Sequence, residues 1–140
     1  MRSSLCALAL ALAPLLAAAQ VPLQPEDARA VRAVIEAQLD AFRHDDARRA
    51  FSYAAPEIQK TFGTPERFLE MVRTAYPVVY RARNVQFEAP SDIDGDVFQP
   101  VRMTDGDGHA WIAIYPMLRG ADGTWRINGC QLGRVRVEEI

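Results

Sequence analysis

The chain has 140 residues, the length of one domain, and 49% of them are hydrophobic while 24% are charged. Its net charge of −2 lacks the basic excess of a nucleic-acid-binding domain, so we expect no nucleic-acid partner. A chain of this length can bury a core large enough to fold without disulfides. Beyond the leader segment described next, the sequence holds one cysteine, Cys130, so no internal disulfide is expected.

Residues 1–19, MRSSLCALALALAPLLAAA, have the three-part layout of a secretory signal peptide. Arg2 supplies a positive charge, an apolar run follows over residues 5–16, and three alanines precede Gln20 as at a cleavage site. The apolar run is too short to span a bilayer well, although a membrane anchor is the alternative. We therefore expect a periplasmic or secreted protein with no membrane attachment once the signal is removed.

After a short lead-in over residues 20–25, the sequence predicts a single domain over residues 26–137. Apolar residues recur at three- and four-residue steps from Ala28 to Phe42, which predicts an amphipathic helix of about five turns. Asp45 or Asp46 can cap a second helix with a narrow apolar face over residues 47–54. Pro56 then starts another turn, which Gly63 can end in the left-handed conformation.

The next helix has both ends marked in the sequence. Thr64 can cap it, Pro65 suits its first position, and Pro77 stops it. Its apolar side chains are typical of a face that packs on a core; they are Phe68, Leu69, Val72 and Tyr76.

Beyond Pro77 the apolar period changes to two, which predicts four strands at about residues 79–89, 97–104, 109–118 and 124–137. Turns with Asp-Gly pairs separate them, and the last strand can break near Gly133. Three helices followed by an antiparallel meander predict an α+β fold, with three N-terminal helices packed on one face of a curved antiparallel sheet.

The two later turns predict a register. A four-residue turn at 105–108 would pair Thr104 with His109 and Arg102 with Trp111. A similar turn at 120–123 would place Trp125 on the same face as Leu118, Ile114 and Ile112. The register of the first hairpin stays open. The expected helix-facing side then holds Val97, Val101, Met103, Ala110, Ile112, Ile114, Leu118, Trp125 and Ile127. The expected outer side holds Phe98, Pro100, Arg102, Thr104, His109, Trp111, Ala113, Tyr115, Met117, Arg126, Asn128 and Cys130.

A family resemblance rests on two stretches, VIEAQLDAFRHDDARRAFSYAAPEIQKTFGTPERFLEMVRTAYPVVYR and HAWIAIYPMLRGADGTWRINGC. From about residue 26 to 132 the chain resembles exported bacterial proteins grouped as domain of unknown function 4864. The order of elements is also similar to the nuclear transport factor 2-like, or cystatin-like, α+β cone. The resemblance implies a curved sheet around helices, often a dimer, with a pocket in the cone. It implies no known activity and carries no catalytic residue onto a numbered position.

The leading functional hypothesis is a non-catalytic protein that binds a small apolar ligand or a protein partner. The expected outer face, with Arg102 stacked on Trp111, would either pair with its twin in a homodimer or line a ligand cavity. A C-terminal segment, GRVRVEEI, that folds over this face is the third possibility. The candidate ligand-binding or interface residues are Arg102, His109, Trp111, Tyr115, Tyr80 and Arg81.

The alternative is a cone-pocket enzyme, an isomerase, dehydratase or hydrolase, that uses His109 or Asp40 as acid or base. It requires these groups and a tyrosine to converge in a concave site. No metal or other cofactor is expected. Counted from Asp92 or Asp105, the twelfth position of a calcium loop is Met103 or Pro116, neither of which is the glutamate that such a loop needs.

Overall fold

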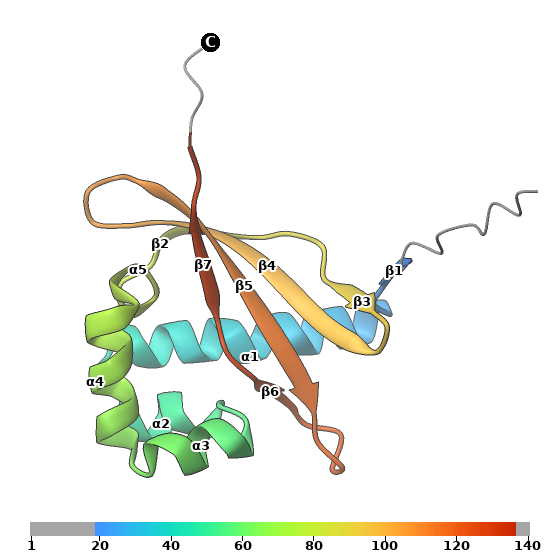
Figure 1. Cartoon of the computed structure of the whole chain (residues 1–140), viewed down its shortest axis with the longest axis horizontal. Coiled ribbons are helices and arrows are strands. Elements are labelled where there is room, and N and C mark those ends of the chain that lie inside the picture. The colour runs from blue at the N-terminus through green and yellow to red at the C-terminus, as the bar shows by residue number, and fades with distance from the viewer. Residues whose placement is uncertain (1–18, 137–140) are drawn as a thin grey trace, which may run out of the picture.

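The computed structural model describes residues 19–136, so the predicted signal peptide lies outside the described residues except for Ala19. Figure 1 shows the helices on one side of an open, curved sheet. None of the helices within residues 19–136 is long and apolar enough to cross a membrane. The helices are α1 (Pro25–Arg43), α2 (Ala47–Ser52), α3 (Pro56–Phe62), α4 (Pro65–Ala75) and α5 (Pro77–Tyr80). The strands are β1 (Gln20–Pro22), β2 (Arg83–Phe87), β3 (Ser91–Ile93), β4 (Asp96–Thr104), β5 (Ala110–Arg119), β6 (Trp125–Ile127) and β7 (Gln131–Arg134).

The helix boundaries follow the capping signals of the sequence. The Asp46 carboxylate accepts a hydrogen bond from the Arg49 backbone N–H, and the Thr64 hydroxyl accepts one from that of Arg67. Gly63 ends α3 with a φ of 75°, a left-handed conformation that suits glycine. The helical region nevertheless holds five segments where three helices were predicted. The turn expected from Pro56 is the helix α3, and Pro77 begins the one-turn helix α5 instead of ending the region.

The sheet has seven strands within the described residues, and its pairings are antiparallel, which confirms the α+β prediction. Its order is β1-β3-β4-β5-β6, with β2 also pairing with β4 and β7 with β5. The β3–β4 turn, whose register the sequence left open, is a two-residue turn in which Asp94 and Gly95 have φ angles of 54° and 90°. Positive φ at both positions is the mark of a type I′ hairpin.

The predicted register of the two later hairpins is wrong by one residue. Thr104 pairs with Ala110 and Arg102 with Ile112, because Asp105 and His109 close a three-residue loop over 106–108. A second three-residue loop over 121–123 gives the β5–β6 hairpin the same shift. In both loops the third residue is a glycine with a φ near 80°, as in a type I turn followed by a bulge.

This slip turns every side chain of β5 to the opposite face. Tyr115, placed on the outer side by the sequence, is 1% exposed and faces the helices together with Ala113 and Met117. Trp111 also leaves the outer face, because it pairs with the buried Met103. Ile112, Ile114 and Leu118 move to the outer face, where Leu118 is 44% exposed.

The last predicted strand is interrupted earlier than expected, at residues 128–130 instead of near Gly133. Ile127 pairs with Met117 and Gln131 pairs with Ile114, so three residues of this edge lie opposite two of β5. This is a β-bulge, and Gly129 at its centre has a φ of 131°. After the bulge β7 runs along the edge of β5, so residues 131–134 extend the sheet and do not fold over its outer face. The last four residues of the segment GRVRVEEI, 137–140, lie outside the described residues.

The core lies between the sheet and the helices. The α1 side chains Val31, Ile35 and Leu39 belong to one buried cluster with Val101 and Tyr115 from the sheet. Figure 1 shows α1 running across the sheet while α2, α3 and α4 gather at one end of it. That end holds the cavity described next.

Candidate functional site

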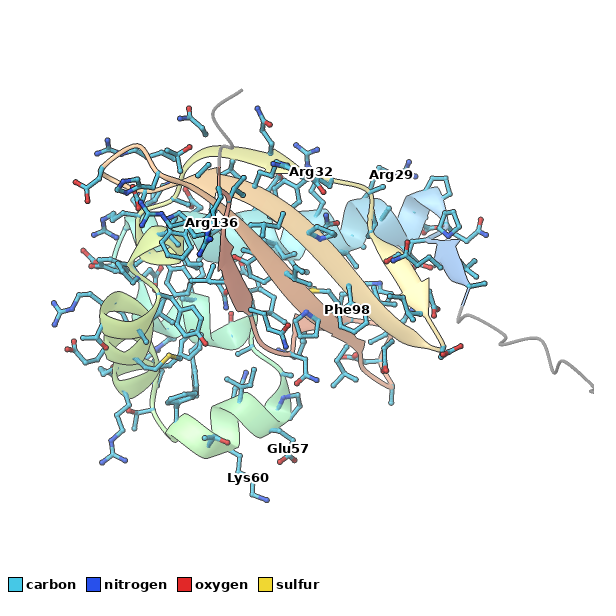
Figure 2. The ribbon with its side chains drawn as sticks, turned by 45° about the horizontal axis from the view of Figure 1, so that its top comes forward. Arg29, Arg32, Glu57, Lys60, Phe98 and Arg136 are labelled. Atoms are coloured by element: carbon cyan, nitrogen blue, oxygen red, sulfur yellow. The ribbon has the colours of Figure 1, made fainter. Side chains whose placement is uncertain are left out.

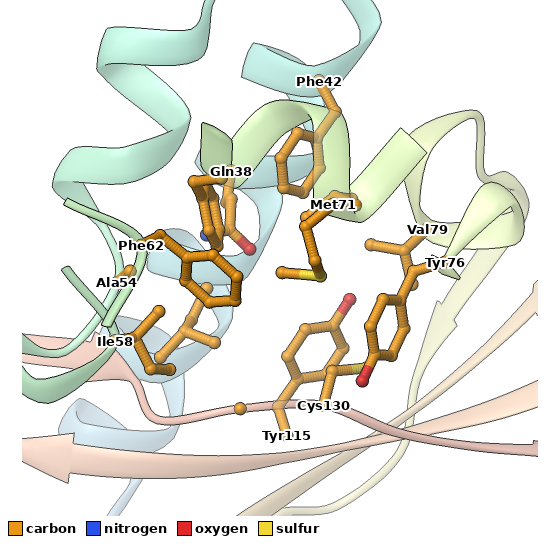
Figure 3. A pocket seen from close by; sticks show the side chains of 14 residues that line it. Gln38, Phe42, Ala54, Ile58, Phe62, Met71, Tyr76, Val79, Tyr115 and Cys130 are labelled. Carbon is orange, nitrogen blue, oxygen red and sulfur yellow. The ribbon is translucent and has the colours of Figure 1, made fainter. Parts of the chain in front are cut away.

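An apolar cavity of about 200 Å³ lies between the helices and the central strand β5 (Figure 3). The helices α1, α3 and α4 supply half of the lining residues, and α5, β5, β6, the bulge at residues 128–130 and the turns beside the helices supply the other half. The lining residues are Gln38, Phe42, Ala54, Ile58, Phe62, Phe68, Met71, Val72, Tyr76, Val79, Tyr115, Ile127, Gly129 and Cys130.

The lining divides into a buried floor and a partly exposed rim. The floor comes from α1, α4 and the sheet, and it includes Phe42, Val72 and Tyr115. The rim comes from α3, α4 and the bulge, whose lining side chains are half-buried. The cavity therefore reaches solvent between α3, α4 and residues 128–130.

Aromatic packing holds one wall of the cavity in place. The Phe68 ring lies 6.1 Å from that of Phe42, 5.5 Å from that of Phe51 and 5.9 Å from that of Phe62, measured between centroids. These tilted and edge-on arrangements are the favoured geometries of aromatic pairs. Since Phe42, Phe62 and Phe68 come from three different helices, their contacts fix α1, α3 and α4 relative to one another.

The Tyr115 hydroxyl is the main polar feature of the cavity. It is buried and has no hydrogen-bond partner among the described residues. The Cys130 thiol is close enough to affect the pKa of Tyr115, but the two groups do not reach the length and angle of a hydrogen bond. Burial raises the pKa of Tyr115 well above its usual value, so the hydroxyl stays neutral and can donate. A buried hydroxyl without a partner is uncommon in native proteins and requires an explanation.

Gln38 provides a second polar atom. Its amide nitrogen donates to the Ala50 carbonyl at 3.1 Å, which fixes the orientation of the carboxamide. The carbonyl oxygen is then turned toward the cavity, as Figure 3 shows. The side chain is 3% exposed, so its free acceptor is available to the cavity and hardly at all to bulk solvent.

The lining is uncharged. Among the described residues that line the cavity, none is Asp, Glu, Lys, Arg or His. Burial raises the pKa of Cys130 to about 12, although the neighbouring Tyr115 hydroxyl acts in the opposite direction. The thiol is therefore protonated at neutral pH and lacks the thiolate that nucleophilic chemistry requires.

Tyr80 and Arg81, two predicted site residues, lie outside the cavity lining. Both contact Asp45 at the end of α1: the Tyr80 hydroxyl donates to its carboxylate, and an Arg81 nitrogen lies 3.0 Å from it. The Arg81 guanidinium also stacks over the Tyr80 ring at 3.8 Å and donates to the Phe42 carbonyl. These contacts tie the segment after α5 to the C-terminal end of α1.

Arg102 and Trp111, expected to stack, lie on opposite faces of the sheet. Arg102 forms an ion pair with Glu88 on the outer side. Trp111 donates its indole N–H to Asp105 at 2.9 Å and lines a separate groove of about 710 Å³. This groove also contains Arg81 and adjoins the cavity where Tyr76 and Cys130 line both.

His109 lies in the β4–β5 loop, where its ring nitrogen is 3.3 Å from the Asp105 carboxylate. Potential metal-ligand atoms of Asp105, Asp107 and His109 lie within 4.8 Å of one another. Asp105 already accepts backbone hydrogen bonds from Asp107 and His109 and a third from Trp111, so turn geometry accounts for the cluster.

The groups required by the enzyme hypothesis do not meet. Asp40 lies 2.7 Å from Arg49 and 3.5 Å from His44, partly exposed. The hydrogen bond from Arg49 is the main cause of the lowered Asp40 pKa. Neither Asp40 nor His109 lines the cavity that contains Tyr115. The described geometry therefore offers no acid–base pair at this cavity.

Of the residues that line the cavity, Tyr115 is among the predicted site residues, whereas Gln38 and most of the wall are not. One signal for Gln38 was present: it continues the apolar stripe of α1 through Val31, Ile35 and Phe42, at steps of four, three and four residues. A polar residue on such a stripe becomes buried with the core. The bulge at residues 128–130, which shapes the rim, has no comparably clear signal.

The comparisons with known proteins bear on the family. A search of curated proteins and a search of solved structures each found no match. A family model described as "Domain of unknown function (DUF4864)" matches residues 24–140, which include every helix of the fold and all strands after β1. The chain therefore belongs to the DUF4864 family.

Proposed function

We propose that the protein binds a small apolar molecule in the cavity between Tyr115 and the helices, without catalysing its conversion. One observation carries this proposal: the buried Tyr115 hydroxyl, which has no partner among the described residues, points into a cavity whose lining is mostly apolar. Leaving such a group unpaired costs about 1–3 kcal/mol, which an occupant with a polar atom would offset. A concave, mostly apolar space with few polar groups is the usual form of a small-molecule site.

The size of the cavity supports a small occupant. A dry apolar cavity of about 150 Å³ holds benzene, so the space of about 200 Å³ here suits a molecule slightly larger than one aromatic ring. Burial of apolar surface contributes about 25 cal/mol per Å², which is the main driving force expected for binding.

A cavity-blocking variant tests the proposal. Met71 lies on the rim, and Met71→Trp would place an indole in the opening. Leu69→Trp is the matched control, because Leu69 is also half-buried on α4 but does not line the cavity. We expect toluene to raise the Tm of the wild type and of Leu69→Trp, and to leave that of Met71→Trp unchanged. Equal shifts in all three proteins would contradict the proposal.

We also propose that the outer sheet face joins two copies of the chain. The outward positions of β4 and β5 are largely apolar, although an antiparallel sheet that faces water normally carries polar residues there. Two such faces would bury each other as in an apolar interface core. The face holds Phe98 (labelled in Figure 2), Pro100, Ile112, Ile114, Pro116 and Leu118.

Two finer proposals concern fold and location. We infer that the fold is a variant of the nuclear transport factor 2-like cone, on the basis of its helices-then-sheet order and its curved open sheet. We infer export to the periplasm or beyond from the signal-like pattern of residues 1–19. Cleavage before Gln20 is the testable form, measured as the N-terminal sequence of the protein isolated from its host.

A further inference from the structure

Two polar atoms with different hydrogen-bonding capacity face the cavity interior. The Tyr115 hydroxyl is neutral and has a free proton to donate, since it has no partner among the described residues. The Gln38 carbonyl oxygen can only accept, because its carboxamide is oriented by the bond to Ala50. Figure 3 shows both atoms directed inward from opposite sides of the close-up, one from α1 and one from β5.

The absence of charge from the described lining restricts the occupant. A carboxylate or an ammonium group would leave water without an opposite charge to meet it, since none of the described lining residues is Asp, Glu, Lys, Arg or His. Desolvation of an unpaired charge is far more costly than the gain from one hydrogen bond. The occupant is therefore neutral in its bound form.

The number of hydrogen bonds restricts the polar group further. A carbonyl or ether oxygen can accept from Tyr115 but has no proton for Gln38. A hydrocarbon satisfies neither atom. A single hydroxyl both accepts and donates, so its hydrogen-bonding capacity matches that of the two protein groups together.

We propose that the ligand is a neutral alcohol or phenol of about one ring, whose hydroxyl accepts a hydrogen bond from Tyr115 and donates one to Gln38. This inference rests on the proposed function and adds the chemical class of the ligand. The ring and its carbon substituents would lie against Phe42, Phe68 and Val72, which belong to the apolar part of the lining.

Three probes of similar size separate these possibilities. Titration calorimetry at pH 7 measures the dissociation constants of benzyl alcohol, toluene and benzoate for the purified protein. We expect benzyl alcohol to bind about three- to tenfold more tightly than toluene, because one or two hydrogen bonds add about that much to the binding constant. Benzoate should bind at least about tenfold more weakly than benzyl alcohol, because its carboxylate would be desolvated without a cation.

Tyr115→Phe is the decisive variant, since it removes the hydroxyl, keeps the ring and breaks no hydrogen bond of the structure. The preference for benzyl alcohol over toluene should fall to about twofold or less, while the affinity for toluene is kept. Gln38→Met tests the acceptor in the same way, although it also removes the bond to Ala50.

The outcomes separate the two proposals. If toluene and benzyl alcohol bind the wild type equally well, or if Tyr115→Phe retains the full preference, the hydroxyl inference is wrong while the binding function stands. If neither toluene nor benzyl alcohol binds, both proposals are wrong.

Discussion

Asp105 and Tyr115 belong to the same hairpin but use their polar atoms in opposite ways. The Asp105 carboxylate accepts hydrogen bonds from the backbone N–H groups of Asp107 and His109 and from the Trp111 indole, each at 2.9 Å. The Tyr115 hydroxyl, six residues after His109, is buried without a partner in the described structure. The Asp105 carboxylate thus uses its acceptor capacity in hydrogen bonds that stabilise the turn. The neutral, buried Tyr115 hydroxyl still has hydrogen-bonding capacity for a ligand.

The pKa values show the same difference. Hydrogen bonding, above all from Trp111, lowers the pKa of Asp105 to about 2, so this carboxylate is ionised at neutral pH. Burial raises the pKa of Tyr115, which keeps its hydroxyl protonated. In the sequence, a cluster of Asp and His is a more obvious candidate for a functional site than a tyrosine in a strand. In the structure, however, the tyrosine is better placed to contact a ligand.

Removal of the whole Tyr115 side chain should have the largest effect. We expect Tyr115→Ala to lower the free energy of unfolding by roughly 3–5 kcal/mol, as for other buried aromatic residues replaced by alanine. Chemical denaturation with urea measures it. A loss below about 1 kcal/mol would mean that the ring is not part of the core.

Removal of the Tyr115 hydroxyl alone should change the free energy of unfolding in the opposite direction. We expect Tyr115→Phe to raise the free energy of unfolding of the ligand-free protein by about 1–2 kcal/mol, because it deletes a buried group that lacks a partner. The same urea denaturation provides the value. A destabilised Tyr115→Phe variant would show that the hydroxyl has a partner in solution and would weaken the case for a ligand.

The contribution of Asp105 to stability should depend on pH. Its folded-state pKa of about 2 lies below the usual 3.9, so its contribution to stability is present above about pH 4 and is lost as the pH falls toward 2. Asp105→Asn should lower the Tm by a few degrees at pH 7 and flatten the pH dependence between pH 4 and 2. Parallel Tm curves for the two proteins over that window would contradict the assigned hydrogen bonds.

A substitution on the exposed outer face of the sheet should have the smallest effect on stability. Leu118→Glu should change the stability of the subunit by less than about 0.5 kcal/mol but convert a dimer into a monomer. Val21→Glu is the control, because Val21 is even more exposed, at 56% against 44%, and lies on β1. Light scattering at micromolar concentration decides: a monomeric wild type would rule out the proposed dimer.

The helical half of the fold was the more predictable part of the chain. The residues that cap α2 and α4 are short-range signals, and each acts within a few residues of its own position. The apolar stripe of α1 likewise needs no knowledge of its partners. The extra one-turn helix after Pro77 was missed because proline can either end a helix or begin one.

In the sheet, a one-residue error in the predicted loop length put Tyr115 on the wrong face. A loop of three residues in place of four moved Tyr115 from the expected outer face into the core, since side chains alternate along a strand. The sequence TDGDGH allows both loop lengths, so tertiary packing made the choice. The cavity itself depends on this register and on the bulge at residues 128–130, and neither can be read from local pattern alone.

The proposed binding function can be tested most directly at the methionine methyl groups. Met71 lines the cavity, whereas Met103 and Met117 are buried outside its lining and serve as internal controls. We expect a titration with benzyl alcohol, followed by methyl-methionine NMR, to shift the Met71 signal in a saturable way and to leave the two controls nearly unchanged. A Met71 signal that stays in place, or shifts of equal size at all three methyl groups, would contradict a ligand site beneath Tyr115.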